Sequence, residues 1–149
     1  MWALRSRCSQ TFCNYAWRIG CEAVLDGPTS TLPTVTTRVL HLIKGLGPGG
    51  AEQLLVNQAR ATEADDLAFS VAYLVSWKNH LVEPLNQARW QTYCLESDRP
   101  WDLRWLVRFR RLVNRERIDV VHGHSPLVAA FARLVLRTVP RKRRPRSIY

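Results

Sequence analysis

The sequence predicts an α/β protein that forms one domain, with a Rossmann-like, doubly wound parallel sheet. Short β-branched runs alternate with longer helical patterns from Arg38 onward, which is typical of βαβ units. The length of 149 residues and the hydrophobic content of 46% suffice for one core and not for two full domains. No run approaches the ~18 consecutive apolar residues of a membrane-spanning helix, and a charged content of only 23% excludes general disorder.

The predicted strands are short apolar runs, each bounded by turn residues or by helical periodicity. They cover residues 39–43, 68–75, 92–95, 118–122 and 147–149. Because the fifth strand only begins at the last residues, we expect the chain to stop within its fold.

The predicted helices lie between these strands. The first opens at Ala51, and the fourth covers residues 127–137 after Pro126, a favoured first helical residue. The second contains Pro84, which must either start it or kink it. The third, residues 101–115, is the most regular in the chain. The stripes expected to face the core are Leu54, Leu55, Gln58 and Ala59 in the first helix, and Trp105, Phe109, Leu112 and Val113 in the third.

Two segments flank this pattern. Residues 1–37 contain no apolar core of a secretory signal and end in a linker rich in Gly, Pro, Ser and Thr, so we predict a disordered extension followed by a domain at 38–149. The net charge is +10, and residues 141–146 carry five basic side chains and no acidic one. Such a run is typical of a solvated linker, although it can also bind nucleic acid or anionic lipid.

The cysteines indicate a reducing compartment. Cys8, Cys13, Cys21 and Cys94 fit neither the paired spacing of a zinc site nor the framework of a secreted disulfide-rich domain. We therefore expect a cytoplasmic protein and assign no metal site.

Residues 45–50 form a glycine-rich loop between the first strand and the first helix. They satisfy G-x-G-x-x-G, so free backbone amides and the helix dipole would favour a phosphate, and a tight turn without a ligand is the alternative. A dinucleotide site also needs an acidic residue at the end of the second strand. Residues 73–78 contain none, and Glu83 comes too late. A dinucleotide-dependent oxidoreductase therefore remains only a weak alternative.

Two histidines follow the fourth strand. His122 and His124 could both bind a metal if the extended conformation continues, but no third ligand is near them in sequence. The surrounding sequence lacks the second glycine of a nucleophile elbow. His124, between strand and helix, could bind a hydroxyl or phosphate group, whereas His122, inside the strand, is interpreted as structural.

The order of these segments resembles a known family. The run 39–43, then Gly49-Gly50-Ala51-Glu52, and then residues 118–124 about seventy positions later are similar to the N-terminal domain of the large retaining glycosyltransferase family with the GT-B fold, family 4. The resemblance spans about residues 37–149. It implies a Rossmann-like domain that faces a second, similar domain across a cleft, with the nucleotide-sugar mainly on the second domain.

The resemblance also implies a chemistry. Gly49 and Gly50 would lie under the donor diphosphate or beside the sugar, with Glu52 next to them, and His124 would lie at the reacting centre. The enzyme would be hexosyltransferase-like and transfer with retention to a saccharide, lipid-linked or other hydroxylated acceptor, with no metal and no cofactor besides the nucleotide-sugar substrate. The second GT-B domain is absent from the sequence, so the chain is truncated relative to a two-domain enzyme, and we expect it to be inactive alone.

A rival hypothesis is a non-catalytic basic module that binds nucleic acid or an anionic membrane. It rests on the 141–146 run and on one helix stripe, Arg104, Arg108, Arg111 and Arg115. The aromatic residues of that helix fall on its apolar side, which makes nucleic acid an unlikely partner. Peripheral contact with the inner face of a membrane is compatible with either hypothesis.

Overall fold

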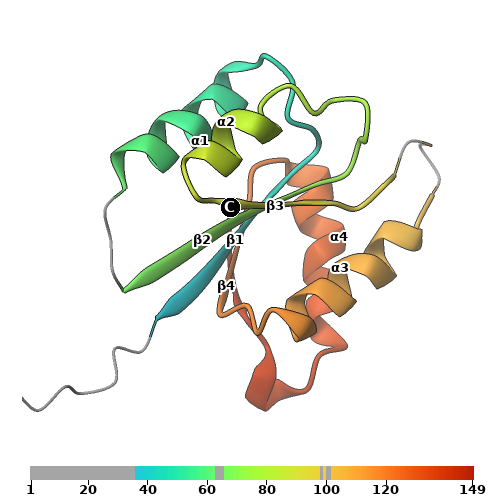
Figure 1. Ribbon diagram of the computed structural model, residues 1–149. Helices are drawn as coiled ribbons and strands as arrows, with labels where there is room; N and C mark the ends of the chain where they lie inside the picture. Colours follow the sequence, from blue (N-terminus) through green and yellow to red (C-terminus); the bar gives the residue numbers. More distant parts are fainter. Residues whose placement is uncertain (1–35, 63–65, 98, 100–101) are drawn as a thin grey trace, which may run out of the picture. The chain divides into compact units, whose positions relative to one another are not determined.

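The computed structural model describes residues 36–62, 66–97, 99 and 102–149, all of which belong to one compact unit (Figure 1). The predicted disordered extension lies outside the described residues, except for its last two. Of these, Thr37 is the first residue of a strand, so the domain begins slightly earlier than expected.

The sheet has five strands, and every pairing is parallel. The strands are β1 (Thr37–Ile43), β2 (Leu67–Tyr73), β3 (Gln91–Cys94), β4 (Val120–Gly123) and β5 (Arg146–Ile148). Their order across the sheet is β3-β2-β1-β4-β5. This order confirms the Rossmann-like fold class, because the chain winds outward from β1 in one direction and from β4 in the other.

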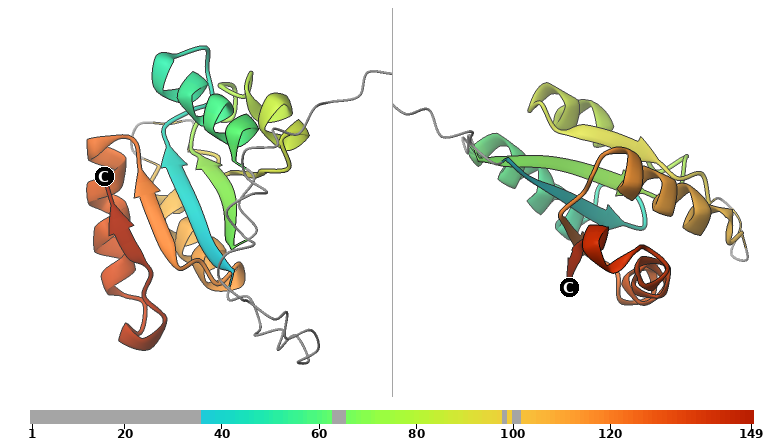
Figure 2. Two further views of the ribbon diagram at one scale, coloured as in Figure 1. Left: turned by 90° about the vertical axis from the view of Figure 1, so that its left-hand side faces the viewer. Right: turned by 90° about the horizontal axis from the view of Figure 1, so that it is seen from below.

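Helices cover both faces of the sheet. They are α1 (Gly50–Ala61), α2 (Val82–Gln87), α3 (Arg104–Arg115) and α4 (Pro126–Arg137). The pair α1 and α2 lies on one face and the pair α3 and α4 on the other (Figures 1 and 2). Pro84 sits in the first turn of α2, where a missing backbone N–H disturbs no helical hydrogen bond. No described helix is both long and apolar enough to cross a membrane.

The core on the α3–α4 side confirms the stripe predicted for the third helix. Trp105, Phe109, Leu112 and Val113 are all buried, and they pack with Leu40 and other apolar residues of the sheet. The helix itself begins at Arg104, whose backbone N–H donates to the Asp102 carboxylate at 2.9 Å. It therefore starts three positions after the predicted residue 101.

The stripe predicted for the first helix is partly wrong. Leu55 and Ala59 are buried as expected, but Leu54 is 63% exposed and Gln58 is exposed, while Val56 is buried instead. Leu55, Val56 and Ala59 also share one helix face, so spacing alone allowed two orientations of the helix about its axis. Packing on the sheet selects the one that buries Val56.

The basic run 141–146 is part of the fold and not a linker, although its five basic residues are exposed as expected. A short 3₁₀ turn at Arg141–Arg143 leads into β5, and Pro145 between them is buried. The Arg144 guanidinium donates to the carbonyls of Arg137 at 2.9 Å and Val139 at 3.3 Å. The last carbonyls of a helix lack intrahelical donors and carry partial negative charge, so an arginine at the end of α4 satisfies them.

Candidate functional site

The candidate site lies where the sheet changes its direction of winding. β1 and β4 are neighbours, yet β1 leads into α1 on one face and β4 into α4 on the other. Ligands of open α/β sheets bind in the crevice beyond the carboxyl ends of two such strands. The glycine loop follows β1 and the histidine loop follows β4, and the His124 backbone N–H donates to the Leu42 carbonyl at 2.9 Å. The structure therefore brings both sequence-predicted segments together.

The first half of the glycine loop packs against the rest of the fold. Gly45 is buried, and a Cβ there would come within 2.8 Å of the Lys78 Cβ. The backbone of Leu46 donates to the Lys78 carbonyl at 2.7 Å and accepts from the Leu81 N–H at 3.1 Å. These residues fix the loop against the segment between β2 and α2, so their role is close packing and not ligand contact.

The second half of the loop is open. Gly49 is the N-cap residue of α1 and offers no side-chain cap, and the first helical hydrogen bond runs from the Gln53 N–H to its carbonyl at 2.9 Å. A Cβ on Gly50 would meet no atom within 4 Å. The start of α1 therefore has no side-chain cap and leaves room beside Gly50, and the positive end of a helix dipole attracts anions.

Glu52 links the two loops electrostatically. Its carboxylate folds back over Gly49, where a Cβ would overlap it. Its charge also raises the pKa of His124, against the larger lowering effects of burial and of His122. A carboxylate accepts hydrogen bonds from hydroxyl groups and repels phosphate, so its position affects which groups can approach the start of α1.

Three histidines, His41 on β1, His122 on β4 and His124 just after β4, lie close together. The ring nitrogen Nδ1 of His41 lies 2.9 Å from Nε2 of His124, and the rings of His122 and His124 are 4.4 Å apart. His41 is only 2% exposed, while the other two are half-buried. Burial, followed by the proximity of His124 and His122, lowers the pKa of His41 to about 3, and burial also lowers the pKa of His124. The pair His41 and His124 is therefore neutral at physiological pH.

Sequence reasoning missed His41. It pairs in register with His122, so their side chains share one face of the sheet although the residues lie far apart in sequence. The only signal was a single polar residue within the buried run of β1, where a histidine needs a partner. The strand order that supplies this partner is not visible in the periodicity.

The same three histidines are the residues that could hold a metal ion. One nitrogen from each lies within 4.8 Å of the others, so the third ligand that the sequence did not reveal is present among the described residues. Zinc sites need nitrogens directed at a common centre about 2 Å away. Two of the nitrogens here, Nδ1 of His41 and Nε2 of His124, already pair with each other.

The buried His41 gives the domain a predicted pH dependence of stability. The folded protein holds this ring neutral down to about pH 3, whereas the unfolded chain protonates it near the ordinary value of 6.5. The unfolded state therefore binds more protons between these values, and the stability supplied by the neutral ring is lost as pH falls through that window. As the pH is lowered, we expect the urea midpoint of unfolding to fall more steeply for the native sequence than for His41→Asn. Equal slopes would contradict this, and His80→Ala, at an exposed histidine, serves as the control.

The arginine stripe of α3 is largely engaged by neighbouring groups. Arg104 pairs with Asp102 at 3.1 Å, Arg115 pairs with Glu116 at 2.7 Å, and Arg108 bonds two carbonyls and pairs with Glu96 at 3.0 Å. Arg111 is exposed and makes no ion pair within the described part of the chain. The stripe lies on α3, away from the two loops at the switch point.

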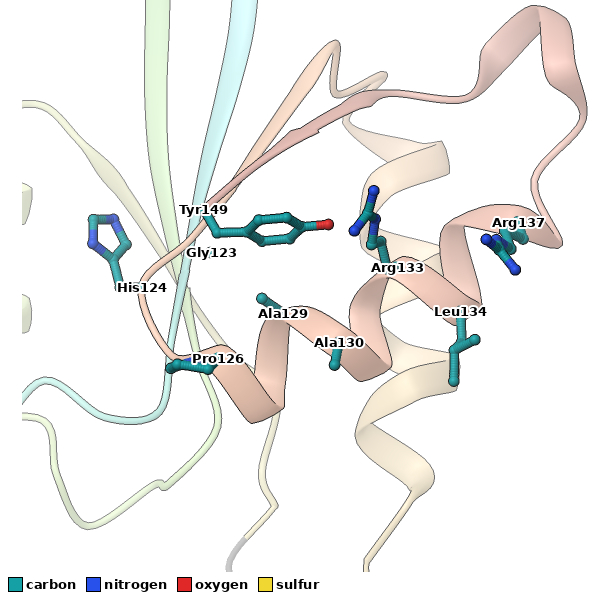
Figure 3. Close-up of a pocket in the computed structure, with 9 residues that line it drawn as sticks. All are labelled: Gly123, His124, Pro126, Ala129, Ala130, Arg133, Leu134, Arg137 and Tyr149. Atoms are coloured by element: carbon teal, nitrogen blue, oxygen red, sulfur yellow. The ribbon is translucent and has the colours of Figure 1, made fainter.

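An open cavity of about 680 Å³ borders α4 and the end of β5 (Figure 3). Its walls are mainly apolar, and the Arg133 guanidinium lies 5.0 Å from the centre of the Tyr149 ring. His124 lies at its edge, but its ring points away from Arg133 and Arg137. Neither His41 nor His122 lines this cavity.

Comparison with known proteins identifies one family. The family model described as Glycosyltransferase Family 4 matches residues 48–149, more than half of the chain. No curated protein matches the sequence significantly. The matched region contains Gly49, Gly50, Glu52 and His124. The chain therefore belongs to Glycosyltransferase Family 4.

Proposed function

We propose that this domain forms one wall of the active site of a glycosyltransferase that moves a sugar from a nucleotide-sugar to a hydroxyl acceptor with retention. The observation that carries the proposal is the meeting of the open start of α1 with His124 at the switch point between β1 and β4, within the region that matches the family. A companion GT-B domain would hold most of the nucleotide. We also propose that the reaction takes place in the cytoplasm and that the acceptor is a saccharide or a lipid-linked molecule.

The start of α1 would act on the leaving diphosphate. Negative charge develops there as the bond to the sugar breaks, and the backbone N–H groups of Gly50 and Ala51 are fixed before the reaction, so their interaction strengthens in the transition state. A surface-exposed charge at a helix N-terminus gains roughly 0.3 to 1 kcal/mol, and exclusion of water by a closing partner domain would increase this.

His124 and Glu52 would orient the sugar and the acceptor. A neutral imidazole forms hydrogen bonds with hydroxyl oxygens without adding a charge, and the carboxylate of Glu52 accepts from a sugar hydroxyl. Correct orientation of the reacting atoms supplies a large part of the rate in such a cleft. No step requires a resident metal or a further cofactor.

The test is an assay of nucleoside diphosphate release from a panel of nucleotide-sugars with hydroxylated acceptors. The chain is measured alone and together with the nucleotide-binding domain of a family 4 enzyme. Because a GT-B site is a cleft between two domains, we expect acceptor-dependent release only with the companion domain present. Robust turnover by the isolated chain would contradict the two-domain cleft.

A further inference from the structure

His41 occupies a fixed position behind His124. Its ring is stacked on Trp90, with 5.2 Å between ring centres and 11° between planes, and on Phe69 at 5.8 Å. With an exposure of only 2%, its ring offers almost no surface to the crevice. Its direct polar link to the crevice is the hydrogen bond between its Nδ1 and Nε2 of His124, which measures 2.9 Å.

One proton lies between these two nitrogens, and its position has a chemical consequence. Burial keeps both rings neutral, so each ring carries a single N–H. Either His41 donates from Nδ1, or His124 donates from Nε2. In the first case the free nitrogen of His124, Nδ1, carries a proton and acts as a donor toward a ligand. In the second case it is a bare acceptor.

The remaining nitrogen of His41 separates the two cases. Its Nε2 is buried and has no hydrogen-bond partner in the described part of the chain. If His124 were the donor, His41 would carry its proton on Nε2, and an N–H group would be buried without an acceptor. Buried N–H groups without partners are rarer in proteins than acceptors that lack a donor. The arrangement with the proton on Nδ1 of His41 is therefore favoured.

We propose that His41 is a positioning residue that donates its Nδ1 proton to Nε2 of His124 and so holds His124 as the Nδ1–H tautomer. His124 then meets its ligand as a hydrogen-bond donor, suited to an oxygen of a sugar hydroxyl or a phosphate. The charged group that acts on His124 from α1 is the carboxylate of Glu52. The effect on transfer rests on the proposed function, whereas the tautomer itself does not.

The decisive experiment is NMR of the full chain with labelled histidines, in which the ring ¹⁵N and ¹³Cδ2 shifts identify the tautomer of His124 near pH 7. EDTA is present so that no adventitious metal occupies the cluster. The expected result is the Nδ1–H tautomer. Observation of the Nε2–H tautomer, which free histidine favours in water, would overturn the proposal, whether or not the protein transfers sugar.

Two substitutions test the same bond from the other side. His41→Asn keeps an N–H close to the position of Nδ1, whereas His41→Leu keeps volume and removes the donor. We expect His124 to remain Nδ1–H in the first variant and to change to Nε2–H in the second. Transfer in the assay with the companion domain should fall about 10- to 100-fold in His41→Leu, the usual loss for a second-sphere hydrogen-bond partner, and be rescued in His41→Asn. Equal losses in two folded variants would contradict a role for this proton.

Discussion

Replacement of His124 with Ala is expected to lower the turnover of sugar transfer by about 100-fold or more, the range found for a well-placed acid–base or orienting group. His124 is half-buried at the end of β4, where its backbone is held by the Leu42 carbonyl and its ring by His41. The substitution removes the group that faces the sugar and leaves the strand and the start of α4 intact. Thermal unfolding should therefore shift little.

The control variants separate catalysis from packing. His124→Gln offers an amide in place of Nε2, so His41 retains a partner, and it should lose turnover without losing stability. His122 lies two residues before His124 and pairs in register with His41, and its ring packs against both other histidines. The control here is His122→Ala. It should lower stability and leave turnover within a few fold. If the His122 and His124 variants lost turnover equally, the roles assigned within this pair would be wrong.

The part of the site that sequence predicted rests on local signals. Gly49 and His124 each lie between a strand and a helix, and Gly50 is the first residue of α1; in a parallel sheet such positions share one edge. The alternation of strands and helices was also sufficient for the fold class. These features depend on residues that are close in sequence, so a single chain reveals them.

The missed features depend on contacts that are distant in sequence. The hydrogen bond between His41 and His124 spans 83 positions and exists only because β4 pairs with β1 and not with β3. The burial of Val56 in place of Leu54 depends on how α1 rotates onto the sheet. The ordering of residues 141–146 depends on the carbonyls at the end of α4 that Arg144 satisfies. Periodicity and composition carry none of this information.

Gly50→Val is expected to lower donor-dependent transfer by about 100-fold or more, because displacement of a substrate by one or two ångströms costs this much in a cleft that acts by positioning. A Cβ on Gly50 meets no protein atom within 4 Å, and no described glycine has a positive φ, so the variant should fold. The valine would occupy the space that the diphosphate or sugar needs.

Gly47→Ala is the matched control in the same loop. A Cβ at that position makes only an ordinary contact, 3.9 Å from the Lys78 Cδ, and it lies before the helix start. Donor use should be nearly unchanged in this variant. Unchanged transfer in a folded Gly50→Val protein would remove the start of α1 from the donor site.

The proposal that the start of α1 and His124 form one ligand site is tested most directly by a ¹⁵N–¹H NMR titration of the full chain. The ligands are millimolar nucleotide-sugars and, separately, inorganic pyrophosphate. We expect the chemical shifts of the backbone amides of Gly49 to Glu52 and of His124 and Ser125 to change, because the two loops meet there at the ends of β1 and β4. We also expect Gly50→Val to abolish the chemical-shift changes at the start of α1. Shifts confined to the cavity at Arg133 and Tyr149, or to the arginine stripe of α3, would contradict it.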